Sequence, residues 1–254
     1  MIERIGRKAV SLIEGAGRWG HFMGDMARAV PDVATWGRLV FVQMRRIGVD
    51  SLPVALFIAA FTGVILALQA SYTFTGTVPL YFVGTLVGKS MMLELGPMLV
   101  GLALAGRVGA SMAAELGTMK VTEQVDALET LAYDPQSYLV VPRVIAGTTM
   151  FPIVVALSIV IGIVTGWLTS MWFLNLSTPE FVKGLKLFYV FKDTWFGLLK
   201  SATFGFAITM VGCLVGLSTR GGAQGVGRST THAQVYSAVL ILMLDAFWAA
   251  TLLR

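Results

Sequence analysis

Charged side chains are scarce in this chain of 254 residues. Asp, Glu, Lys and Arg together make up 13% of the sequence, whereas residues of the set AVILMFWYC make up 56%. About a quarter of an average soluble domain is charged, so a water-exposed globule of this size would be short of surface charge. A disordered chain would be far less apolar. The composition therefore excludes both classes and indicates a polytopic membrane protein.

Cysteine and histidine are also rare. The single cysteine, Cys213, cannot form an intrachain disulfide and lies among apolar residues, so we expect a buried, inert thiol. His21 and His232 lie in separate segments with no second ligand at metal spacing, and we expect no metal site. A phosphate-binding loop that ended at Lys89 would need glycine at position 83, which is valine.

The uncharged runs are long enough to cross a bilayer. Residues 51–88 form 38 consecutive positions without a charged side chain, and residues 144–179 form 36 more. Because roughly 20 residues span the hydrocarbon core as a helix, the sequence predicts an all-α integral membrane protein with a single domain, 1–254. We expect about five transmembrane helices, at 51–74, 80–106, 143–174, 195–218 and 233–253. The glycines of 219–232 predict a flexible turn.

The segment before the first span has a different pattern. Apolar residues recur at helical spacing over 1–23, and Arg4, Arg7 and Lys8 fall on the opposite side. This pattern predicts an amphipathic, interfacial helix that lies in the headgroup plane. A second helical stretch leads from Pro31 to the first span, so we expect residues 1–50 to be interfacial and lead-in helices and 51–253 to be the transmembrane bundle.

The distribution of basic residues predicts the orientation. Thirteen of the 19 Lys and Arg side chains fall in segments that alternate to one side, which indicates a cytoplasmic N-terminus. The segment 180–192, with three lysines, would then be outside, as would Arg254. Glu3, Glu14 and the low serine content do not suit a transit peptide, so we expect a multi-pass protein of a bacterial inner membrane.

A few charges interrupt the apolar runs. An ionisable group inside a bilayer is costly and usually faces a cavity or a partner. Glu94 is therefore a functional candidate, with Pro97 just beyond it. The alternative is that Lys89 and Glu94 neutralise each other or neighbouring backbone groups for structural reasons. Lys200 is expected to reach the outer interface with its flexible chain. We expect Asp245 to make a structural hydrogen bond to a neighbouring helix.

Small residues recur every four positions in three places. These stripes are Ala105, Gly109, Ala113 and Gly117; Gly162 and Gly166; and Gly212 and Gly216. In lipid, such stripes let helix backbones approach closely. We expect packing within one subunit, with a subunit interface as the alternative.

The stretch between the second and third expected spans is amphipathic. Val121, Val125, Leu128 and Ala132 would form one apolar stripe on a helix whose polar face is acidic. A helix that lies on a membrane surface would favour a basic polar face. The acidic face therefore favours docking into the groove of a protein partner.

Five consecutive motifs carry a resemblance to a known family. They are ELGP at 94–97, AGRVGA at 105–110, AELGTMKVTEQVDAL at 114–128, DP at 134–135 and VPR at 141–143. In these motifs, and over nearly its whole length, the chain resembles the MlaE permease family. The members of this family are the membrane subunits of ABC transporters that work with MCE-domain lipid-binding proteins.

The resemblance implies a function and partners. The chain would form a homodimer bound to two cytoplasmic ATPase subunits, which would bind ATP and Mg, and would itself hold neither a cofactor nor nucleic acid. It would move phospholipid or a related lipid between the inner membrane and a periplasmic MCE protein, and so contribute to outer-membrane lipid homeostasis. With no ATPase site of its own, it would not be an enzyme.

The resemblance also implies roles for particular residues. Residues 113–132 resemble the coupling helix that meets the ATPase, with Glu115, Lys120, Val121, Glu123, Val125, Asp126 and Leu128 as expected coupling residues. The expected substrate-cavity residues are Lys89, Leu93, Glu94 and Lys200, where Leu93 replaces a basic residue of some family members. The expected structural residues are Pro97, Arg107, Gly109 and Asp245.

Two other classes of function stay open at this point. A proton-coupled secondary carrier could use Glu94, Lys89 and Asp245 as a relay, and its transport would follow a proton gradient without ATP. A membrane scaffold or intramembrane enzyme would act as the purified chain alone. No nucleophile and base occur at usable spacing, which disfavours the enzyme.

Overall fold

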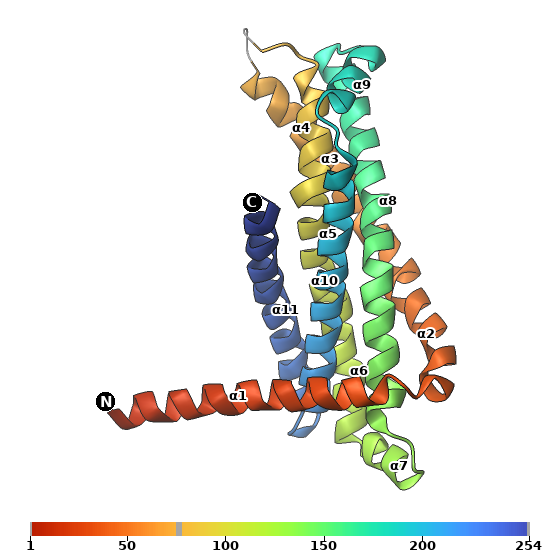
Figure 1. Ribbon diagram of the computed structural model, residues 1–254, viewed down its shortest axis with the longest axis vertical. Coiled ribbons are helices and arrows are strands. Elements are labelled where there is room, and N and C mark those ends of the chain that lie inside the picture. Colours follow the sequence, from red (N-terminus) through yellow and green to blue (C-terminus); the bar gives the residue numbers. More distant parts are fainter. Residues whose placement is uncertain (1, 75–77, 253–254) are drawn as a thin grey trace.

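The protein is a bundle of long helices. The computed structural model describes residues 2–74 and 78–252, and within those ranges it contains helices and connections but no β-strand. Five helical segments are long and apolar enough to cross a membrane: Val33–Thr73, Phe82–Val121, Gln136–Leu174, Phe191–Leu217 and Gly222–Thr251. The long helices stand side by side, with α7 at one end and α9 at the other (Figure 1). The predicted all-α membrane architecture is confirmed.

The first span contains the expected lead-in helix. It consists of α2 (Val33–Ile47), a 3₁₀ turn (Val49–Ser51) and α3 (Leu52–Thr73). Both α2 and α3 pack against α8 (Val141–Leu174). The bend between α2 and α3 falls at Gly48, where a Cβ atom would collide with the side chain of Met150. The helical segment that contains the first span therefore begins at α2, and its uncharged part, α3, matches the expected span 51–74.

The second span is one continuous helical rod with two wide turns. Its parts are α4 (Phe82–Ser90), the π-helical turn η2 (Met91–Leu95), α5 (Gly96–Leu104), the π-helical turn η3 (Ala105–Gly109) and α6 (Ala110–Val121). The helix continues past residue 106, the expected end of the span, as far as Val121. Single π turns inside α-helices are frequent at functional sites, and η2 contains Glu94.

The remaining elements complete the bundle. They are α7 (Gln124–Thr130), the π-helical turn η4 (Gln136–Val140), α8, α9 (Thr178–Leu187), α10 (Phe191–Leu217) and α11 (Gly222–Leu252). The predicted flexible turn at 219–232 is wrong, since α11 begins at Gly222. Within 219–232, only Gly221 and Gly222 have positive φ angles, of 90° and 65°. Packing against α10 and α6 outweighs the low helix propensity of the other glycines in this segment.

The stripes of small residues join helices of one chain. A Cβ atom on Gly212 in α10 would lie 3.1 Å from the carbonyl oxygen of Gly109, and one on Gly216 would lie 3.2 Å from the Cα atom of Ala113. A Cβ atom on Gly63 in α3 would collide with the carbonyl group of Gly162 in α8. The expectation that these stripes pack within one subunit is confirmed.

Replacing Gly63 with alanine should destabilise the bundle. The new methyl group would collide with the backbone of α8 and approach Thr165 Oγ1 to 2.6 Å, and overpacking of this kind costs about 1–3 kcal/mol. Gly37→Ala is the matched control, because the nearest atom to its Cβ is Val33 Cγ1 at 3.7 Å. Thermal unfolding in detergent measures both variants. Equal stability of Gly63→Ala and the unchanged protein would contradict the close α3–α8 contact.

The first helix, α1 (Ile2–Ala29), crosses the bundle near its α7 end, roughly at right angles to the long helices (Figure 1). Its Phe22 is 7% exposed and packs with Leu139 and Val140 of the bundle. This direction suits a helix that lies on a membrane surface. The side chains of residues 1–14 and 16 lie outside the described ones, as does Arg254, so the apolar face over 1–23 and the location of the C-terminus stay predictions.

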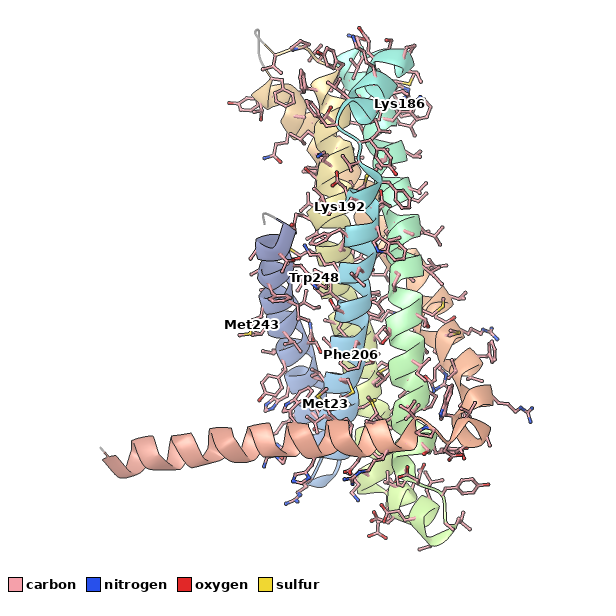
Figure 2. All side chains as sticks on the ribbon, in the orientation of Figure 1. Met23, Lys186, Lys192, Phe206, Met243 and Trp248 are labelled. Atoms are coloured by element: carbon pink, nitrogen blue, oxygen red, sulfur yellow. The ribbon has the colours of Figure 1, made fainter. Side chains whose placement is uncertain are left out.

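The opposite end of the bundle carries α9. The hydroxyl and backbone N–H of Ser177 both donate to the Glu180 carboxylate, at 2.6 and 3.0 Å, and hold the pKa of that carboxyl below its usual range. The ionised group caps the helix. Lys186 and Lys192 lie at this end, whereas Met23 of α1 lies near the other (Figure 2). The lysine-rich segment and the basic N-terminal segment are thus at opposite ends, as the predicted topology requires.

Candidate functional site

Three charged side chains from three helical segments meet inside the bundle. Lys200 Nζ in α10 lies 2.5 Å from Glu94 Oε2 in η2 and 2.6 Å from Asp245 Oδ1 in α11. The Lys200 side chain is fully buried, while those of Glu94 and Asp245 are 39% and 15% exposed. We call these three residues the charge cluster. The two carboxylates compensate the buried ammonium group, which alone would be very costly in this setting.

Pro97 shapes the charge cluster through the backbone. Proline has no N–H, so the carbonyl oxygen of Leu93, four residues earlier, lacks its α-helical donor. Lys200 Nζ lies 3.3 Å from this oxygen and donates to it. The ammonium group therefore donates hydrogen bonds to Glu94 and to the Leu93 carbonyl, and it forms an ion pair with Asp245. Leu93 contributes its backbone to the site, although its side chain is apolar.

Close packing fixes the helices around the charge cluster. A Cβ atom on Gly197 would collide with the carbonyl oxygen of Met92, so α10 lies directly against η2 one turn before Lys200. On the other side, Trp248 Nε1 donates to Thr203 Oγ1 at 3.0 Å and joins α11 to α10. Figure 2 shows Trp248 between α11 and the rest of the bundle.

Lys89 and Lys200 have different partners from those that the sequence suggested. Lys89 does not neutralise Glu94, because its Nζ lies 3.3 Å from Asp193 Oδ2. Lys200 does not reach the interface either: α10 begins at Phe191, which places Lys200 about 14 Å along the helix at 1.5 Å per residue. Asp245 contacts the neighbouring helix α10 through its ion pair with Lys200, rather than through the hydrogen bond that we expected.

The segment 113–132 is not one helix. α6 ends at Val121, Glu123 has a positive φ of 60°, and α7 begins at Gln124. Val125 is only 4% exposed and packs with Leu116 and other residues of its own chain. Val125 and Leu128 of the predicted stripe therefore attach α7 to the bundle, whereas Ala132 is exposed, and docking of this segment onto a protein partner stays a prediction.

Exposed residues in and next to α7 form a surface separate from the packed apolar stripe. We define the α7 face as the exposed residues Glu123, Asp126, Glu129, Leu131 and Tyr133. Leu131 is 69% exposed and Tyr133 is 49% exposed. The side chain of Lys120 bonds to Asp126 at 2.7 Å and leaves the two glutamates as the remaining charges. The face combines exposed apolar groups with acidic ones, at the tip of the bundle (Figure 1).

Glu115 lies at a junction of three helices. Its carboxylate accepts from Arg143 of α8 at 2.9 Å and from Arg46 of α2 at 3.2 Å, so it joins α6 to both helices. The Arg143 side chain is 4% exposed. Nearby, Arg107 in η3 donates to Ser51 Oγ at 2.5 Å. These contacts hold the α7 end of the bundle together.

The sequence profile described as Permease MlaE matches residues 40–251, a range that contains the charge cluster, Glu115 and the α7 face. The chain belongs to the MlaE permease family. With its five apolar helices, it is a multi-pass membrane protein of the ABC transporter permease type.

Relatives of this MlaE permease match it over most of their length. A probable ABC transporter permease protein of Rickettsia typhi is 39% identical over 239 residues, 94% of this chain and 92% of that protein. One of Synechocystis sp. is 40% identical over 205 residues, 81% and 78% of the two chains. The intermembrane phospholipid transport system permease protein MlaE of Haemophilus influenzae is 29% identical over 245 residues, 96% and 94% of the two chains.

The structure of the MlaE permease adds residues that the sequence did not indicate. Asp193 is 8% exposed, but it lies beside Lys192 at the edge of an apolar run and resembles a loop charge. Arg46 and Arg143 flank spans, where positive charges are common. Burial of Asp193 and Arg143 is the signal that distinguishes them, and burial is not visible in one sequence.

Removing the Glu115 carboxylate should loosen the α7 end. Glu115→Ala would leave Arg143 buried without its acidic partner, and because Glu115 itself is partly exposed we expect a loss of about 2 kcal/mol. Thermal unfolding in detergent measures the change. Glu129→Ala is the matched control, since Glu129 is exposed and makes no ion pair with a described side chain. An equal effect of both substitutions would contradict the role of the junction.

Proposed function

We propose that this MlaE permease is the membrane subunit of an ATP-driven transporter. It would move phospholipid between the inner membrane and a periplasmic MCE-domain lipid-binding protein. The observation that carries the proposal is the charge cluster inside an otherwise apolar bundle. A phospholipid combines apolar chains with a charged headgroup, and sites for such molecules are apolar with a few convergent polar groups. The name of the Haemophilus influenzae relative supports the class of cargo.

The part of the chain closest to the headgroup would be Glu94. It is the most exposed member of the charge cluster, at 39%, whereas Lys200 is fully buried. Lys89 and Asp193 lie one to two turns closer to the α9 end and form a second polar contact. We infer that a headgroup interacts with Glu94 while Lys200 keeps the carboxylates in position.

ATP hydrolysis would occur in a partner. We infer that the α7 end faces the cytoplasm, as the basic residues of the N-terminal half favour, and that two ATPase subunits, with ATP and Mg, contact the α7 face of two chains. The second span runs without a break from Phe82 to Val121 and contains Glu94. Closure of the ATPase subunits would push on α7, and this rigid rod would transmit the movement to the charge cluster.

The outer face of α11 supports a homodimer. The apolar window of α11 is 17% buried, the lowest share of the five described spans. Its exposed apolar side chains are Val235, Tyr236, Val239, Leu242, Met243 and Phe247. Met243 points away from the bundle (Figure 2). A second copy on this face would place the two charge clusters on either side of one interface.

Transport from reconstituted liposomes tests the proposal. Vesicles containing the permease and its ATPase would carry fluorescent phospholipid. A soluble MCE-domain protein outside the vesicles would exchange this lipid with them. We expect transfer that requires ATP and stops without the ATPase. Transfer that follows a proton gradient and persists without ATP would instead support a secondary carrier that uses Glu94, Lys89 and Asp245.

A further inference from the structure

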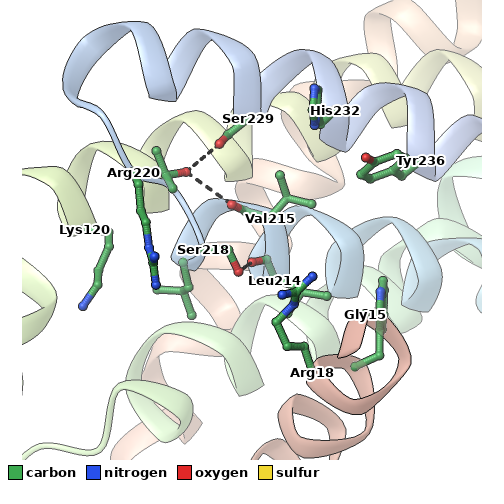
Figure 3. A pocket seen from close by; sticks show the side chains of 13 residues that line it. Gly15, Arg18, Lys120, Leu214, Val215, Ser218, Arg220, Ser229, His232 and Tyr236 are labelled. Carbon is green, nitrogen blue, oxygen red and sulfur yellow. Dashed lines mark hydrogen bonds between the residues drawn. The ribbon is translucent and has the colours of Figure 1, made fainter. Parts of the chain in front are cut away.

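A second polar site lies at the α7 end, separate from the charge cluster. It is a cavity of about 640 Å³ where α1 meets the ends of α6 and α10 and the start of α11 (Figure 3). Its basic residues are Arg18, Lys120, Arg220 and His232, and its hydroxyl-bearing residues are Ser218, Thr219, Ser229 and Tyr236. Among the described residues that line the cavity, none is Asp or Glu.

The charges of this cavity are unbalanced. Lys120 bonds to Asp126 at 2.7 Å, so its charge is partly compensated. Arg220 is exposed and forms no ion pair with any side chain that the structure describes. Arg18 adds a second guanidinium group from a different helix. An anion that enters the cavity would therefore meet an excess of positive charge, and guanidinium groups match the geometry of phosphate oxygens.

The turn that carries Arg220 is held firmly in place. Gly221 and Gly222 adopt positive φ angles, and a Cβ atom on Gly225 would collide with the carbonyl oxygen of Arg220. The buried Thr219 donates from Oγ1 to Ser229 Oγ at 2.7 Å and fixes the end of α10 to the first turns of α11. The backbone that positions Arg220 is thus pre-formed, which lowers the entropy lost when a ligand binds.

The walls and the location of the cavity indicate the kind of ligand. Trp19, Leu214 and Leu217 supply apolar surface beside the basic groups. The cavity lies at the level of α1, which crosses the bundle in the direction expected of a helix at the membrane surface (Figure 1). A helix in the headgroup plane, as α1 is predicted to be, would place the headgroups of the adjacent leaflet at this level. The volume of the cavity lies within the range of about 300–1,000 Å³ that is usual for small-molecule sites.

We infer that this cavity binds the phosphate group of an anionic phospholipid in the leaflet at the α7 end. Arg220 and Arg18 contact the phosphate from two sides, and Trp19 contacts the apolar part of the molecule. The bound lipid thereby links α1 to the turn between α10 and α11. This site is distinct from the transport path proposed above, and its occupancy does not depend on ATP. A soluble phosphate ion shares the chemistry of the headgroup, so the test includes it.

Native mass spectrometry of the delipidated full-length chain in detergent, with any subunits that copurify, tests the inference. The protein is titrated with phosphatidylglycerol, with zwitterionic phosphatidylcholine and with inorganic phosphate. We expect one tight phosphatidylglycerol per chain, and about tenfold weaker binding in Arg220→Gln and in Arg18→Gln, as the loss of one charge-assisted contact predicts. Arg228→Gln is the matched control, because Arg228 is exposed on α11, eight residues after Arg220, but does not line the cavity.

The outcomes separate the sources of the phosphate. Selective loss of phosphatidylglycerol in the two cavity variants supports the lipid site. Phosphate binding that is weakened by Arg220→Gln, without lipid binding, would assign the same cavity to a soluble phosphate and overturn the lipid as its ligand. An equal loss in Arg228→Gln would show diffuse attraction to a basic surface and would overturn the site. So would unchanged lipid binding in both cavity variants, with thermal unfolding confirming that each is folded.

Discussion

Replacing Lys200 with methionine should sharply reduce the yield of folded protein and abolish lipid transfer. The substitution leaves the carboxylates of Glu94 and Asp245 close together inside the bundle without a positive charge between them. Breaking a buried ion pair by removing one partner costs about 3–5 kcal/mol, a large part of the total stability of a typical domain. Thermal unfolding and the monodisperse fraction on size exclusion, both in detergent, measure the effect. Lys186→Met, at an exposed lysine of α9, is the control.

A compensated variant separates stability from function. Lys200→Met combined with Glu94→Gln and Asp245→Asn removes all three charges and should recover most of the stability, because neutral side chains of similar size replace the cluster. Transfer should stay at background, since a neutral site no longer offers a charge to the headgroup. If this triple variant transports at the normal rate, the charge cluster only holds the helices together and the proposed function loses its main support.

The apolar runs predicted the architecture correctly, because the length of an uncharged run can be read from the sequence without knowledge of tertiary contacts. Residues 51–74 and 143–174 match α3 (Leu52–Thr73) and α8 (Val141–Leu174) closely. The error at α11 has a physical cause: its first turns are rich in glycine and polar residues, and contacts with α10 and α6 stabilise them as helix. Local propensity is a weak guide where tertiary packing opposes it.

The sequence identified most charges of the site but not their partners. Glu94 and Lys200 are 106 positions apart, and Lys200 and Asp245 come from adjacent helices, so their contacts depend on how α10 packs between η2 and α11. The closeness in sequence of Lys89 and Glu94 suggested a pair that the fold does not form. Pro97 could be recognised as a residue that frees a carbonyl group, yet only the structure shows that Lys200 occupies it.

The amphipathic pattern predicted which residues in and around α7 are apolar and which are acidic, but not which surface the apolar residues contact. The pattern correctly separated apolar from acidic residues, but it could not tell whether the apolar stripe covers its own bundle or a partner. Val125 is buried in this chain, and the positive φ of Glu123 breaks the helix that the pattern assumed to be continuous. Residues near the end of α7, Leu131 and Tyr133, are exposed although they lie outside the predicted stripe.

Changing Leu131 and Tyr133 to arginine should abolish copurification of the ATPase while the permease itself remains folded. Leu131 is largely exposed and Tyr133 is half-exposed, with one aromatic neighbour in Tyr138, so we expect their loss to have a small effect on the stability of the chain alone. Buried apolar and aromatic anchors at an interface each contribute about 2 kcal/mol or more, and one such loss weakens binding about 30-fold. Affinity purification through a tag on the permease, followed by quantification of the ATPase, measures the result.

Two comparison variants make this result specific to the α7 face. Leu187→Arg, at a residue 46% exposed at the α9 end, should leave the ATPase bound. Val125→Asp should reduce the yield of the permease itself, because it places a charge among Leu116, Leu139 and Val140 in the packed core of this end. Normal recovery of ATPase with the Leu131→Arg and Tyr133→Arg variant would show that the ATPase contacts the permease at another surface. The unbroken rod from Phe82 to Val121 would then no longer explain how ATP hydrolysis reaches Glu94.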